Sequence, residues 1–113
     1  MPPPLSEALA SEACDRAESL SDGQLRLWAR NSPLAGRSEV IQLLRSRSLE
    51  LARTDPQGAE RVARIAVELA EQLGQRPSSE LAADLRAEAL GALANALRAQ
   101  ECFSEAQETW QAV

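Results

Sequence analysis

Pairs of carboxylates at helical spacing are the residues of this chain that could perform acid–base chemistry or hold a metal ion. They are Glu68/Glu71, Glu80/Asp84 and Asp84/Glu88, whose members stand three or four residues apart. Acids at this spacing are also the ordinary solvated side of a helix. Because nothing in the sequence marks any of these carboxyls as buried, we interpret them as solvated.

The residue types that are missing restrict the chemistry further. The chain has no His and no Tyr, and all 12 basic residues are Arg. Without His there is no imidazole base, no Ser–His or Cys–His nucleophile pair and no His metal ligand, and di-metal helical bundles need a Glu-x-x-His motif. Without Lys there is no Schiff base and no phosphate-loop lysine. We therefore predict no enzymatic activity, no cofactor and no metal site.

The two cysteines, Cys14 and Cys102, lie far apart and fit no metal-binding spacing. We expect each to act as a small hydrophobic residue in or near a helix interface.

Composition favours helices. The chain of 113 residues is 44% hydrophobic but only 3% aromatic, and Ala and Leu supply most of the apolar surface, whereas β-branched and aromatic residues favour strands. The sequence therefore predicts an all-α fold in a single compact domain. Arg without Lys beside abundant Ala indicates a GC-rich, bacterial coding sequence. With no signal peptide, long apolar run or lipidation motif, we expect a cytoplasmic protein that does not enter a membrane.

The net charge of −5 is unevenly distributed. Residues 1–23 sum to −4, residues 24–64 to +4 and residues 65–113 to −5. Such a basic middle between acidic flanks can make neighbouring helices attract one another. The middle also holds an arginine cluster that could contact phosphate (Arg37, Arg45, Arg47 and Arg53), although an acidic chain disfavours non-specific binding to nucleic acid.

Helix signals divide the chain into segments. Residues 1–4 predict a disordered start. Residues 5–37, with helices expected over 5–20 and 24–30, are predicted to be an N-terminal helical cap. Ser38 is expected to cap a helix over 39–53. Asp55-Pro56 starts a helix that Gly74 closes, a long helix runs from 78 or 79 to about 100, and a last one starts near 104.

The segment 87–113 resembles one tetratricopeptide (TPR) repeat. The residues that carry the resemblance are Leu90, Leu93, Ala94 and Leu97, followed after a turn by Ala106 and Trp110. A degenerate copy covers about 39–73. The resemblance implies antiparallel helical hairpins over 38–113, stacked as a short TPR-like right-handed solenoid or bundle.

In the TPR family the first helix of each repeat lines a groove that receives a peptide or partner helix. Carried over by position, the residues that would face this groove are Glu88, Gly91, Asn95 and Arg98. The position of Asn95 often bonds a ligand backbone in the family. A solvated polar side of a helix is the other interpretation.

The sequence thus predicts a non-enzymatic protein–protein interaction module, a scaffold or adaptor within a larger bacterial protein, holding a protein partner or neighbouring domain. One alternative is a homodimeric structural domain that pairs through an exposed end at Phe103, Trp110 and Val113. A further alternative is a regulatory helical domain that contacts nucleic acid through the Arg-rich middle.

Overall fold

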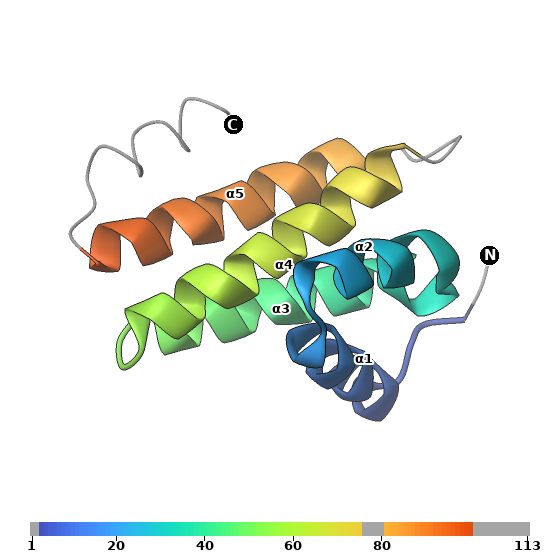
Figure 1. Ribbon diagram of the computed structural model, residues 1–113, viewed down its shortest axis with the longest axis horizontal. Helices are drawn as coiled ribbons and strands as arrows, with labels where there is room; N and C mark the ends of the chain where they lie inside the picture. The colour runs from blue at the N-terminus through green and yellow to red at the C-terminus, as the bar shows by residue number, and fades with distance from the viewer. Residues whose placement is uncertain (1–2, 76–80, 101–113) are drawn as a thin grey trace.

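The computed structural model of the protein describes residues 3–75 and 81–100. Its elements are α1 (Glu7–Ser19), α2 (Asp22–Asn31), the 3-10 helix η1 (Pro33–Gly36), α3 (Ser38–Leu51), α4 (Pro56–Gly74) and α5 (Ala82–Ala99), as Figure 1 shows. These described residues contain no strand, so the all-α prediction is confirmed.

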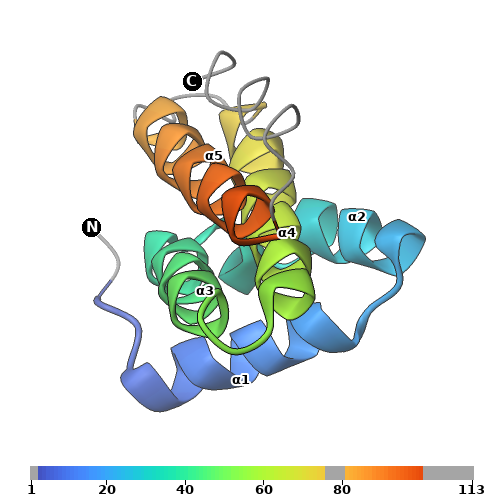
Figure 2. The same ribbon diagram turned by 90° about the vertical axis from the view of Figure 1, so that its left-hand side faces the viewer.

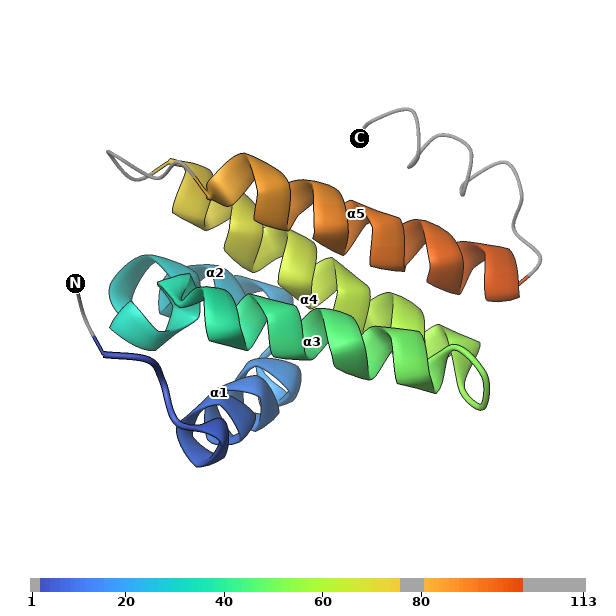
Figure 3. The same ribbon diagram turned by 180° about the vertical axis from the view of Figure 1, so that it is seen from behind.

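Three helices make the body of the molecule. α3 and α4 form an antiparallel hairpin, and α5 packs against both of them, running in the same direction as α3 (Figure 3). α1 lies across the other side of this hairpin, where it contacts α3 and α4, and α2 packs on α4 (Figure 2). The N-terminal cap predicted over 5–37 therefore supplies α1, α2 and η1.

The main core joins the cap to the hairpin. Its largest fully buried side chains include Ile41, Leu44 and Leu69, and Ala and Cys residues of α1 and α2 complete it. A smaller cluster of Ala63, Leu93 and neighbouring residues fills the contact between α4 and α5. Because so many core residues are Ala, the helix backbones can approach closely.

Two buried polar groups sit between helices. The Ser48 hydroxyl is fully buried and donates to the Ala59 carbonyl at 2.7 Å, which ties α3 to the start of α4. The Cys14 thiol, also fully buried, lies 3.5 Å from the Val40 carbonyl. Cys14 is thus the interface residue that was predicted, whereas Cys102 lies outside the described residues.

Local signals place most of the helix ends. Ser21 and Gln24 form a reciprocal capping box at α2. At α4 the Asp55 carboxylate accepts a hydrogen bond from the Gly58 amide at 3.0 Å, and Pro56 follows at the first helical position. Asp55 and Pro56 therefore begin this helix as predicted.

The predicted cap of α3 is wrong by one residue. Ser38 is the first helical residue and Arg37 is the N-cap, with no side-chain hydrogen bond to the helix. The cause is η1, because the Arg37 amide bonds to the Leu34 carbonyl as the 3-10 turn closes, and this sets the entry of the chain into α3. Gly74 likewise ends α4 inside the helix, and Gln75 is the C-cap.

The uneven charge along the sequence becomes contact between helices. The Arg47 guanidinium on α3 lies 2.6 Å from the Glu18 carboxylate and 2.9 Å from the Asp15 carboxylate of α1. Arg26 on α2 lies 3.6 Å from Glu68 on α4. The attraction predicted between the basic middle and its acidic flanks is therefore present. Among the described helices, none combines the length and the apolar character that a membrane crossing requires.

Candidate interaction surface

The four residues that the TPR resemblance assigns to a groove all lie on α5. Glu88 and Arg98 are exposed, and Gly91 and Asn95 are half-buried. At 3.6 residues per turn, positions spaced by three and four fall on one side of a helix. The structure therefore places all four in a single row, which Asp84 extends by one further turn at the start of the helix. We call this set of five residues the α5 row.

The opposite side of α5 faces the core. Its buried residues are Ala82, Leu85, Ala89, Leu90, Ala92, Leu93, Ala94, Ala96 and Leu97. Because these residues occupy the sides directed to α3, α4 and the core, the charged residues of the α5 row are left exposed, as are Ala83 and Ala99. The charged residues of the row, Asp84, Glu88 and Arg98, make no ion pair with any described residue.

The other predicted surface falls outside the described residues. Phe103, Trp110 and Val113 belong to 101–113, as do the residues predicted to form the second helix of the TPR-like repeat. Neither the exposed end nor the complete repeat is therefore described by the structure, and both stay predictions.

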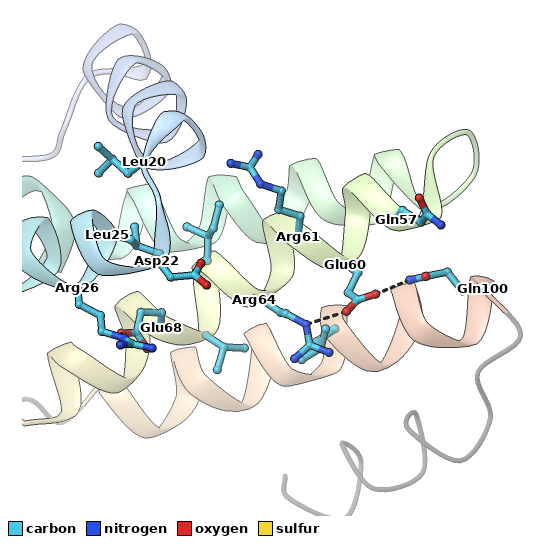
Figure 4. A pocket seen from close by; sticks show the side chains of 13 residues that line it. Leu20, Asp22, Leu25, Arg26, Gln57, Glu60, Arg61, Arg64, Glu68 and Gln100 are labelled. Atoms are coloured by element: carbon cyan, nitrogen blue, oxygen red, sulfur yellow. Dashed lines mark hydrogen bonds and ion pairs between the residues drawn. The ribbon is translucent and has the colours of Figure 1, made fainter.

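A groove between α2, α4 and α5 is a feature that sequence reasoning missed. It has a volume of about 690 Å³, and Leu20, Leu25, Ile65 and Leu93 give it an apolar floor. Figure 4 shows charged side chains along its edges, contributed by α2 and α4. The α2–α4–α5 groove could not be anticipated, because three helices from distant parts of the sequence have to pack before it exists.

The charges of this groove are largely paired with one another. Glu60 accepts a hydrogen bond from the Gln100 amide at 3.0 Å and lies 2.8 Å from the Arg64 guanidinium (Figure 4). These contacts, Gln100 first and then Arg64, lower the pKa of the Glu60 carboxyl. The Glu60–Arg64 pair was visible in the sequence at i,i+4 spacing, whereas the contact with Gln100 is not a local signal.

An Arg–Glu pair at the start of α3 holds the N-terminal segment. The Leu5 amide donates to the Glu39 carboxylate at 2.7 Å, and the Arg37 guanidinium donates to the Pro3 carbonyl at 2.7 Å. The two side chains also bond each other at 3.1 Å. The hydrogen bond from Leu5 is the main reason that the pKa of Glu39 falls to about 2, with Arg37 contributing less.

The arginine cluster of the middle segment is divided by the fold. Arg37 and Arg47 are engaged by acidic side chains, whereas Arg45 and Arg53 have no ion-pair partner among the described residues. Trp28, the aromatic residue of the cap, packs against the main core. Two of the four arginines of the cluster are therefore already engaged by acids of the same chain.

The carboxylate pairs do not converge on a site within the described part of the chain. Glu68 faces Arg26, and Glu71 lies 3.6 Å from Arg86, so each member of this pair has its own arginine. Asp84 and Glu88 are exposed. Residues 3–75 and 81–100 contain no group of three or more side chains arranged to hold a metal ion.

None of the protein-family models matches this chain, and no similar curated protein or solved structure was found.

Proposed function

We propose that this chain is a non-enzymatic protein–protein interaction module, a TPR-like scaffold or adaptor that binds a polypeptide partner along the α5 row. In this proposal the protein is a cytoplasmic, bacterial one, and the module belongs to a larger chain. The partner contacts Glu88, Asn95 and Arg98 through polar groups.

The α5 row is the observation that carries the proposal. It sets charged and amide side chains in one line on a helix whose opposite side is buried, and its charges are unpaired among the described residues. A surface of this kind gives a partner both orientation and register.

The alternatives have less support. Contact with nucleic acid through the Arg-rich middle would need cations that are free, and most of the arginines there already bond acidic side chains or backbone carbonyls. Pairing of two copies through Phe103, Trp110 and Val113 remains a separate hypothesis about residues 101–113.

A peptide-display selection tests the proposal. Peptides selected on the wild-type chain are re-measured by fluorescence anisotropy on Asn95→Ala and Glu88→Ala. Loss of one hydrogen bond is expected to weaken binding about fivefold, since such bonds contribute about 1 kcal/mol each. Arg86→Ala is the matched control, because Arg86 is on the same helix but faces Glu71 of α4.

Two results would count against the proposal. The first is a selection that enriches no peptide over an unrelated helical protein of similar charge. Alternatively, the selected peptides lose affinity for Arg64→Ala, at the edge of the α2–α4–α5 groove, while Asn95→Ala and Glu88→Ala bind them normally. The second result would move the binding surface to that groove.

A further inference from the structure

The two ends of the α5 row carry opposite charges. Asp84 and Glu88 lie in the first half of α5, and Arg98 lies in its last turn. All three side chains are exposed, and none has an ion-pair partner among the described residues. By contrast Arg86, on another side of the same helix, lies 3.6 Å from Glu71. The unpaired charges of α5 are therefore gathered on the outer side of the helix.

The spacing of these charges is symmetric. Asp84 and Arg98 each stand seven residues from Gly91, so they are separated by about 21 Å along the helix axis. If a second α5 lies antiparallel to the first with a two-fold axis at Gly91, Asp84 of each copy faces Arg98 of the other. Glu88 and Asn95 stand three and four residues from Gly91, so Glu88 lies near Asn95 of the other copy, one residue out of register. The row is therefore complementary to itself, which is the property that a two-fold interface requires.

The turn between α3 and α4 lies next to the basic end of this surface. Gln100, directly after α5, donates to the Pro56 carbonyl at 3.2 Å, which places the turn between α3 and α4 at the same end of the molecule as Arg98 (Figure 3). Arg53 lies in this turn, is exposed and has no ion-pair partner among the described residues. The same turn holds Asp55, whose exposed carboxylate caps α4, so the turn carries no net charge and Arg98 alone provides the basic end of the α5 row.

From this complementarity we infer that the polypeptide partner of the α5 row is a second copy of this chain, docked antiparallel through α5. The inference rests on the proposed function, because it names the partner of the same surface. The two Asp84–Arg98 pairs between the copies set the register. The dimer weakens with salt, since these pairs are exposed to solvent.

Exchange of the two charges tests the inference. Sedimentation velocity from micromolar to millimolar concentration, at low and at high salt, measures dimer formation by the full chain. Reversing one charge, Asp84→Arg or Arg98→Glu, puts like charges together at two symmetry-related places. Each substitution is expected to weaken the dimer about tenfold or more, because every charge pair occurs twice in a two-fold interface.

A mixture of the two single variants provides the decisive measurement. The Asp84→Arg copy then offers two arginines to the two acids of the Arg98→Glu copy, so the mixture is expected to form a heterodimer although neither variant pairs with itself. The same complementarity returns in the double variant Asp84→Arg/Arg98→Glu. Arg86→Glu is the control that leaves the dimer unchanged, and far-UV circular dichroism verifies that each variant is folded.

The outcomes separate the inference from the proposed function. A wild-type chain that stays monomeric at every concentration overturns the inference, as does a dimer that neither single variant weakens or that the mixture fails to restore. If selected peptides still bind the α5 row of such a monomer, the proposed function stands without the dimer. If the variants alter neither dimer formation nor peptide binding, both fall.

Discussion

Replacing Glu39 by Gln is expected to destabilise the protein in a pH-dependent way. The Glu39 carboxylate accepts the Leu5 amide and lies beside Arg37, so it anchors the start of the chain to α3. Glutamine has nearly the same shape and can still accept a hydrogen bond. The substitution therefore removes the charge and leaves the packing in place.

The size of the effect follows from the difference between the pKa of the Glu39 carboxyl in the unfolded and in the folded state. Its pKa falls from 4.5 to about 2, chiefly through the hydrogen bond from Leu5. Because one pKa unit corresponds to about 1.4 kcal/mol, this difference sets an upper bound of about 3 kcal/mol on the stabilisation. Solvent reaches 30% of the Glu39 side chain, and screening of such a partly exposed group reduces the expected loss to about 1–2 kcal/mol.

The sign of the pH dependence is fixed by the direction of the pKa change. A lowered pKa in the folded state stabilises the protein above the ordinary pKa of about 4.5, and this contribution disappears as the pH falls toward about 2. The wild type should therefore exceed Glu39→Gln in stability near neutral pH. The difference in stability should shrink as the pH falls from about 4.5 to about 2, and it should vanish at lower pH.

Urea denaturation followed by circular dichroism across this pH range measures the difference. Glu50→Gln is the matched control, because Glu50 is an exposed acid on the same helix without an ion-pair partner among the described residues. A Glu39→Gln variant as stable as the wild type near neutral pH would contradict this prediction. A loss of stability that is the same at every pH would contradict it too, because such a loss points to packing and not to charge.

Three further substitutions or treatments test the core and the caps. Ser48→Ala should cost about 1 kcal/mol in urea denaturation, because it removes the buried hydrogen bond to the Ala59 carbonyl. Gly58→Ala, which usually gains about 1 kcal/mol in a helix, should give no gain here, since the new methyl group would lie 2.2 Å from the capping Asp55 carboxylate. In an Asp55→Ala background the same change should stabilise the protein, as thermal denaturation of the four variants would show. Burial raises the pKa of the Cys14 thiol to about 11, so peptide mapping should find it unmodified by a thiol reagent near neutral pH until urea unfolds the chain.

The sequence predicts the helices well because their signals are local. Asp55 and Pro56 begin α4 through contacts within one turn, and scarce strand-forming residues exclude a sheet. The α5 row was likewise predictable, because residues three and four apart share one side of a helix in any tertiary arrangement. The start of α3 was missed by one residue, since η1 is set by Pro33 and the turn that follows it.

Contacts between distant segments could not be predicted in the same way. Glu39 meets Leu5 across 34 residues, and Arg47 meets Asp15 across 32. Charge counting did anticipate that the basic middle would attract the acidic flanks. It could not say which arginine would meet which acid, because that depends on how α1 lies across α3.

An unpaired arginine at the end of a helix can stabilise the helix dipole or bind a partner, and the α5 row needs an experiment that separates these two roles. Arg16, Arg30 and Arg98 all lie in the last turn of their helices, where a positive charge stabilises the helix dipole. This role alone would explain Arg98, and with it Asp84 in the first turn, without any partner. It predicts a loss of about 0.3–1 kcal/mol for each reversed charge, independent of protein concentration. If the chain forms the dimer, stability instead rises with protein concentration, and mixing the two single variants restores the stability that each of them has lost. Concentration dependence therefore distinguishes a helix that is stabilised by its own charges from one that uses them to bind a second copy.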